Sequence, residues 1–151
     1  MRLTGCLLAL ASWLFCAASQ AACTDLVLGQ HTWHSHDGYE EDGMDYEYNN
    51  NNYLVGCVTE DEHLVAVFEN SYEKTTVLVA HTWKDNSYSP YVSPYLVLGV
   101  ASGYKDHLAH VGPLSPYGFV GLDIHPVNNK YGLMISTAFT VTSVGVRFAL
   151  K

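Results

Sequence analysis

The C-terminal stretch 140–151 alternates strictly between two kinds of side chain. One set is branched or aromatic and consists of Val144, Val146, Phe148 and Leu150, whereas the residues between them are small or charged. Because successive side chains leave opposite faces of a β-strand, this period of two predicts a strand with one apolar face. If that face meets lipid and the other face meets a narrow polar lumen, the chain forms a small membrane barrel.

Three earlier stretches, 95–104, 117–124 and 130–138, repeat the same alternation. Their apolar faces consist of Leu96, Leu98, Val100, Val120, Leu122, Ile124, Leu133 and Ile135. The opposite faces hold mainly glycine, alanine and serine, which suit the lumen of an eight-stranded barrel because only side chains fit inside it. A soluble barrel would have large apolar residues inside and many charges outside.

Four further strands are expected at 25–34, 53–59, 63–69 and 75–83, where β-branched residues are frequent. No segment has a helical period, and the strands follow one another as hairpins. The sequence therefore predicts an all-β fold, an eight-stranded up-and-down antiparallel barrel. The longest connection, 37–52, is acidic and rich in asparagine, and we expect it to be an exposed loop without strands.

The first 21 residues have the features of a cleaved secretory signal peptide, with Arg2 before an apolar segment and the small residues Ser19 and Ala21 at its end. We therefore expect a signal peptide at 1–21 and one β-barrel domain at 22–151. Export would leave Cys23 and Cys57 in a compartment that allows a disulfide between neighbouring strands. Two unpaired thiols are the alternative.

Charge excludes one class of partner and favours another. The chain has 15 acidic and seven basic residues, so binding of nucleic acid through a basic surface has no support. From Val92 onward the only acidic residues are Asp106 and Asp123, too few for solvated strand faces. We expect an outer-membrane protein, with the periplasm as the alternative, and a monomer without a cofactor. Its expected partners are outer-membrane lipid or lipopolysaccharide, together with a surface partner at the acidic loop 37–52.

Aromatic residues lie near the ends of the expected strands. They are Trp33, Tyr53, Trp83, Tyr95, Tyr104, Tyr117 and Tyr131. Such positions fit the aromatic girdles of a membrane barrel. The same residues would also suit the core of a soluble β-sandwich or a lipocalin-like barrel.

On these patterns the mature chain resembles the small Gram-negative outer-membrane barrels, the size class of the lipid A deacylase, the lipid A palmitoyltransferase and the OmpA-type domain. A local likeness is to uncharacterised exported proteins of proteobacteria and phages. It is carried by an N-x-N-Y-x-x-G segment at Asn50 to Gly56 and by the pair Asn70-Ser71. The chain lacks the His-x-Ser-Asn arrangement of the deacylase, and it ends on Lys151 rather than on an aromatic residue.

Two candidate sites lie at the outer ends of the expected strands. Ser71, His36 and Glu69 have the residue types of a nucleophile, a base and an orienting carboxylate, as acyl transfer requires, although Asn-Ser is also ordinary turn chemistry. His34, His36 and Asp37 could bind a transition metal, with a polar barrel rim as the alternative.

A third candidate pair, Asp123 and Arg147, is expected on the lumen faces of two nearby strands, where the two charges would neutralise each other. This role is structural. For function, the sequence favours a non-enzymatic surface or envelope-interaction protein. The alternatives are a lipid A-modifying hydrolase or acyltransferase at the barrel rim and a soluble periplasmic barrel that binds a ligand or inhibits an enzyme.

Overall fold

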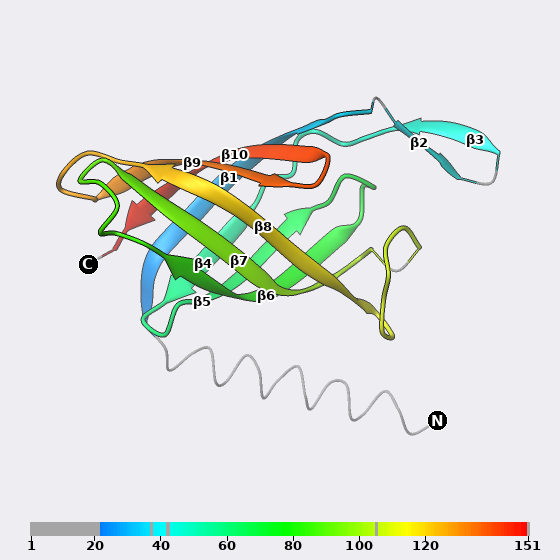
Figure 1. Ribbon diagram of the computed structural model, residues 1–151. Helices are drawn as coiled ribbons and strands as arrows, with labels where there is room; N and C mark the ends of the chain where they lie inside the picture. Colours follow the sequence, from blue (N-terminus) through cyan, green and yellow to red (C-terminus); the bar gives the residue numbers. More distant parts are fainter. Residues whose placement is uncertain (1–21, 37, 42, 105, 151) are drawn as a thin grey trace, which may run out of the picture.

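The computed structural model describes residues 22–150 except 37, 42 and 105, so the expected signal peptide lies outside the described residues. Eight strands close into an antiparallel barrel in the order β1-β10-β9-β8-β7-β6-β5-β4, and β4 pairs with β1 (Figure 1). The barrel strands are β1 (Cys23–His34), β4 (Val55–Thr59), β5 (His63–Glu69), β6 (Thr75–Lys84), β7 (Val92–Ser102), β8 (Leu114–Ile124), β9 (Tyr131–Ala138) and β10 (Val141–Ala149). The predicted all-β, eight-stranded up-and-down barrel is confirmed. Within the described ranges no helix is long and apolar enough to cross a membrane.

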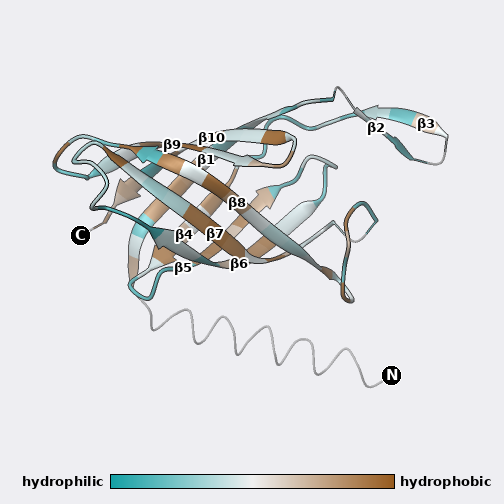
Figure 2. Cartoon of the chain, viewed as in Figure 1, coloured by the Kyte–Doolittle hydropathy of each residue, from teal (hydrophilic) through white to brown (hydrophobic). Residues whose placement is uncertain are grey.

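The alternation in β10 separates its two faces as predicted. Val146 and Phe148 point outward with 38% and 43% of their surface exposed, whereas Ser143 and Arg147 are buried in the lumen. The same outward direction holds on β7, β8 and β9, where Figure 2 shows apolar stretches on the barrel strands. Each of the eight barrel strands carries at least one exposed large apolar residue. The outside of the barrel is thus an apolar belt.

The lumen is more apolar than the sequence predicts. Its buried side chains include Leu64, Phe68, Leu78, Tyr95 and Val97 in addition to the expected small residues. The small-residue face of β7 was identified from Gly99 and Ala101, whereas the first half of that face carries Tyr95 and Val97. Strands β5 and β6 are apolar on both faces. An eight-stranded barrel is filled by its own side chains, so large residues from one half require small residues opposite them.

Glycines in the wall provide this space. A Cβ at Gly121 of β8 would lie 2.6 Å from the ring of Tyr95, and a Cβ at Gly99 would lie 2.2 Å from the carbonyl oxygen of Val79. Gly121 therefore lets the Tyr95 ring pack across the lumen, whereas Gly99 allows the close approach of the β6 backbone.

The acidic segment 37–52 was predicted as a loop without strands, and this prediction is wrong for its first part. A hairpin of β2 (Gly38–Glu41) and β3 (Met44–Glu47) projects beyond the barrel (Figure 1). Tyr39 and Tyr46 are direct cross-strand partners with ring centroids 5.4 Å apart, and Gly43 adopts a positive φ of 76° at the turn. Cross-strand aromatic stacking and a glycine turn stabilise this hairpin without an apolar period.

We call the end of the barrel where β1 ends the mouth, because the hairpin and the longer connections lie there. Near this end the pairing between β8 and β9 is incomplete, and we call this part of the wall the incomplete seam. β8 pairs with β7 over its whole length, but its pairs with β9 extend only from Val120 to Ile124. Pro116, which has no backbone N–H to donate, lies in the part of β8 without a β9 partner.

Candidate functional site

A serine and a histidine meet at the mouth. His34 is the last residue of β1, just beyond the exposed Trp33 at the edge of the belt, and Ser71 lies in the turn between β5 and β6. The Nε2 atom of His34 is 2.8 Å from the Oγ atom of Ser71. Its Nδ1 atom is 3.0 Å from the Oδ1 atom of Asn50. Because an amide oxygen only accepts, Nδ1 carries the proton, and Nε2 accepts the hydrogen bond from the Ser71 hydroxyl.

Asn70 fixes the turn that carries Ser71. Its side chain is fully buried, and its Oδ1 atom accepts hydrogen bonds from the backbone N–H groups of Tyr72 at 2.9 Å and Lys74 at 3.0 Å. Its Nδ2 atom donates to the carbonyl oxygen of Gly103 at 2.9 Å. Such asparagine turns close on themselves through the side chain. This turn is also tied to the end of β7, so the position of Ser71 is set by tertiary structure.

The asparagine run joins this turn to β1. Asn49 donates its backbone N–H to the carbonyl oxygen of Ser71 at 2.9 Å and its side-chain amide to Glu69 Oε1 at 2.9 Å. Asn52 is buried, accepts from the Thr32 hydroxyl at 2.7 Å and donates to the carbonyl oxygen of Glu69 at 2.7 Å. The run therefore holds the Ser71 turn against the strand that carries the histidine.

In the described part of the chain, the predicted catalytic set of Ser71, His36 and Glu69 is not joined by contacts between these side chains. Within the described residues, the side chain bonded to the Ser71 hydroxyl is His34, not His36, and the Glu69 carboxylate faces Asn49. His36 is exposed and lies beyond the end of β1. Sequence reasoning missed Asn50 because the run was interpreted as loop; its position is set by pairing of 50–52 with β1, which local periodicity does not reveal.

A pocket of about 440 Å³ extends from this pair into the lumen. His34 and Ser71 lie on its lining, together with apolar and aromatic side chains that include Phe68, Tyr104, Leu108 and Phe119. Pro116 and Gly118 from the part of β8 without a β9 partner, and Phe139 from the β9–β10 turn, also line it. The Ser71 hydroxyl thus lies at the entrance of an apolar cavity, beside the incomplete seam.

Aromatic rings surround the pair. The ring of Tyr48 is stacked on the His34 imidazole, with centroids 4.1 Å apart and an interplanar angle of 14°. The ring of Tyr72 lies 5.8 Å from that of Tyr48 and stacks on His107 at 3.6 Å. Burial, with a smaller contribution from Tyr48, raises the pKa of Tyr72 to about 12. Burial lowers the pKa of His34, and the hydrogen bond with Asn50 opposes this effect, so the imidazole is neutral at pH 7.

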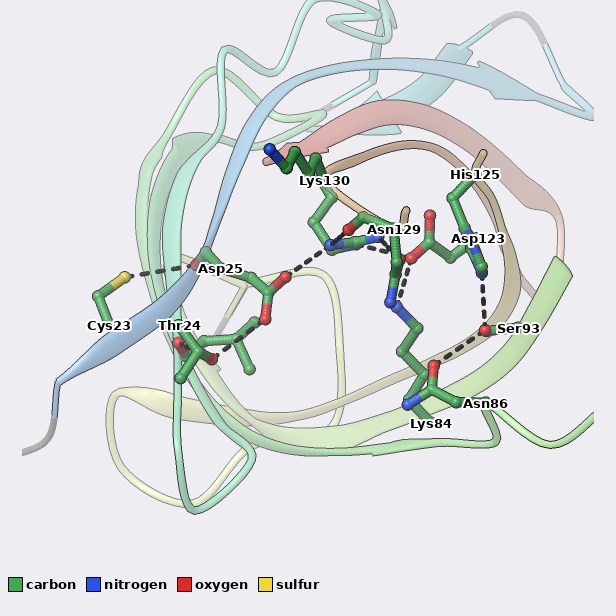
Figure 3. Close-up of polar contacts among 12 residues, drawn as sticks. Cys23, Thr24, Asp25, Lys84, Asn86, Ser93, Asp123, His125, Asn129 and Lys130 are labelled. Carbon is green, nitrogen blue, oxygen red and sulfur yellow. Dashed lines mark hydrogen bonds and ion pairs between the residues drawn. The ribbon is translucent and has the colours of Figure 1, made fainter. Parts of the chain in front are cut away.

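A cluster of charged side chains lies inside the end of the barrel opposite the mouth, which we call the floor. Asp123 is buried, and its Oδ2 atom lies 2.6 Å from both Arg147 Nε and Lys84 Nζ (Figure 3). Arg147 also bonds to Asp25 at 2.7 Å and to the side chain of Asn129. The predicted lumen pair of Asp123 and Arg147 is in contact, and Lys84 and Asp25 extend it to two cations and two anions. Sequence reasoning missed Lys84 because it ended the strand at the preceding residue.

Cys23 and Cys57 form a disulfide that joins the neighbouring strands β1 and β4, with Cα atoms 5.7 Å apart. For the metal hypothesis, Asp37 lies outside the described residues. Both ring nitrogens of His34 are engaged by Asn50 and Ser71. In the described part of the chain no three His, Cys, Asp or Glu side chains are arranged to hold a metal ion.

Comparison of the chain with family models and with curated proteins finds no match. The fold and the site define only a general class of protein. The protein is a small closed antiparallel β-barrel with a hydrogen-bonded serine, histidine and asparagine at its mouth.

Proposed function

We propose that this protein is an outer-membrane barrel that transfers or hydrolyses lipid acyl esters, with Ser71 as the nucleophile and His34 as the base. The observation that carries the proposal is the 2.8 Å contact between His34 Nε2 and Ser71 Oγ at the entrance of the apolar pocket. A serine, a histidine and a third group that orients the imidazole form the arrangement that activates hydroxyl nucleophiles. The sequence alone favours a non-enzymatic surface protein, and this contact favours the enzymatic alternative.

The reaction follows from the positions of the two atoms. His34 Nε2 takes the hydroxyl proton while Ser71 Oγ forms a bond to the ester carbonyl carbon, and the carbonyl electrons move to its oxygen. When the intermediate collapses, the ester C–O bond breaks and the leaving alkoxide takes the proton from Nε2. Water or a second hydroxyl then attacks the acyl-serine by the same two steps, which returns Ser71 to its starting state. Asn50 holds the Nδ1–H tautomer throughout.

Two features support a lipid as the substrate. The belt exposes large apolar side chains on every barrel strand, whereas soluble monomers rarely expose wide apolar patches. The pocket is lined mainly by apolar and aromatic side chains, and beside it residues 114–119 of β8 have no β9 partner, so an acyl chain could enter from the side of the barrel. A membrane position, with the mouth at the outer surface, would bring acyl esters to Ser71 at the level where headgroup and acyl chain meet.

Expression of the full chain in a Gram-negative host, followed by mass spectrometry of phospholipids and lipid A, tests the proposal. Wild type should change the acyl composition, whereas Ser71→Ala and His34→Gln should leave it as in cells without the protein. Ser87→Ala, in the exposed loop between β6 and β7, is the matched control and should behave as wild type.

Two outcomes would contradict the proposal. The first is an unchanged lipid profile although wild type is folded in the outer-membrane fraction. The second is recovery of the folded protein in the soluble periplasmic fraction without detergent, which would remove the membrane position.

A further inference from the structure

The His34 imidazole has one neighbour that the mechanism above does not use. Asn50 occupies the Nδ1 edge and Ser71 the Nε2 edge, and Tyr48 covers a ring face. The centroid distance of 4.1 Å and the interplanar angle of 14° describe a parallel stack. The partly buried imidazole is therefore enclosed by two hydrogen-bond partners and one aromatic face.

The chemistry of the site requires stabilisation of a positive charge. When Ser71 gives up its proton, His34 becomes an imidazolium ion in both halves of the proposed reaction. A carboxylate in the third position would stabilise that ion by its charge, but Asn50 is a neutral amide and supplies only a dipole. The remaining stabilisation of the imidazolium ion has to come from another group in contact with the ring.

We propose that Tyr48 is a positioning residue that stabilises the cationic form of His34 through its ring face, in place of the carboxylate of a serine–histidine–aspartate triad. This inference rests on the proposed function. An aromatic face attracts a cation placed over it because the ring quadrupole is negative there, and the attraction increases where water is excluded.

The surroundings of Tyr48 keep its ring in place. Its ring lies 5.4 Å from that of Tyr39 in the β2–β3 hairpin and 5.8 Å from that of Tyr72 in the β5–β6 turn. It also directly precedes the asparagine run, which is tied to both β1 and the Ser71 turn. The missed hairpin thus has a role, since it packs one side of the ring that covers the base.

Other titratable groups near His34 have to be separated from the effect of Tyr48. They are Tyr39 in β2, Glu69 at the end of β5, Tyr72 and Glu73 in the β5–β6 turn, and His107 in the connection after β7, which stacks on Tyr72. Tyr48 contributes to the raised pKa of Tyr72, and Tyr48→Phe and Tyr48→Leu both remove that contribution. Tyr48→Phe and Tyr48→Leu both remove the hydroxyl, but only Tyr48→Leu removes the ring face. The comparison of these two variants therefore isolates the stacked ring.

The test uses the full chain in phospholipid vesicles and two measurements. The first is the pH profile of kcat for release of fatty acid. Loss of the ring in Tyr48→Leu should lower kcat about 3- to 30-fold, the size of a cation–π contact. It should also shift the acidic limb of the profile to lower pH, because the imidazolium becomes harder to form. Tyr48→Phe should keep both values close to wild type.

The second measurement is the NMR titration of the His34 ring protons in detergent micelles, assigned with His34→Gln. It should give a lower pKa for His34 in Tyr48→Leu than in Tyr48→Phe, and it needs no enzymatic activity. Equal titration curves and equal acidic limbs in the two variants would overturn the role of Tyr48 while leaving the proposed function intact. Turnover that persists in Ser71→Ala would instead overturn the proposed function.

Discussion

Substitution of Asp123 by Asn tests whether the charge cluster at the floor holds the barrel together. The change keeps the size of the side chain but removes the anion that accepts 2.6 Å hydrogen bonds from both Lys84 and Arg147. Four strands meet at this point, since Asp25, Lys84, Asp123 and Arg147 belong to β1, β6, β8 and β10. The variant leaves two cations facing one anion in a place where Arg147 is almost fully buried.

The expected loss can be estimated from the contacts. Removal of one partner from a buried ion pair costs about 3–5 kcal/mol, because the remaining charge stays desolvated. Arg147 keeps its bonds to Asp25 and Asn129, and Lys84 is partly exposed, so we place the loss at the lower end, about 3 kcal/mol. With a urea m-value of about 2 kcal/mol per M, the unfolding midpoint should fall by about 1.5 M.

Urea unfolding of the folded protein in detergent micelles, followed by tryptophan fluorescence, measures this change. Asp61→Asn is the matched control, because Asp61 is an exposed carboxylate in the turn between β4 and β5 at the same end of the barrel. It should leave the midpoint unchanged. A midpoint for Asp123→Asn equal to that of Asp61→Asn would refute the view that the cluster stabilises the barrel.

Three further outcomes are expected. Gly132→Ala should lower the unfolding midpoint as Asp123→Asn does, because the new Cβ would lie 1.8 Å from Asp123 Oδ1 and displace it; an unchanged midpoint would show that the cluster tolerates the shift. Reduction of the Cys23–Cys57 disulfide, whose cysteines lie 34 residues apart, should lower the free energy of unfolding by about 4 kcal/mol, whereas a double Ser variant should not respond to reductant. Activity should rise with pH, and the midpoint of this rise should lie below 6.5, because burial lowers the pKa of His34 and only its neutral form accepts the proton; a midpoint above 6.5 would contradict this role.

The barrel could be predicted from the sequence because its signal is local. In β10, Phe148 and Arg147 leave opposite faces of one strand, and the same period of two on its neighbours determines which side chains line the lumen. The contact of Asp123 with Arg147 follows from that pattern. The pattern did not predict the role of Lys84, because the end of a strand has no period. It did not predict the hairpin at 38–47 either, because the stability of the hairpin comes from stacked rings rather than from an apolar face.

The candidate site could be predicted only in its residue types. His34 and His36 are two positions apart and would share a face if the strand continued, so spacing alone does not distinguish which one meets Ser71. The choice depends on where β1 ends and on the pairing of the asparagine run with it, both of which are tertiary features. The role of Asn50 depends on the same pairing, because four identical residues in a row carry no positional signal.

Detection of an acyl-enzyme on Ser71 tests the central claim most directly. The full chain in vesicles of a phospholipid with one defined acyl chain would be quenched in acid during turnover and analysed by intact mass and peptide mapping. We expect a mass gain of one acyl group on the peptide that contains Ser71, and no gain in Ser71→Ala. Release of fatty acid at the same rate by wild type and Ser71→Ala, with no acyl group on Ser71, would contradict the claim.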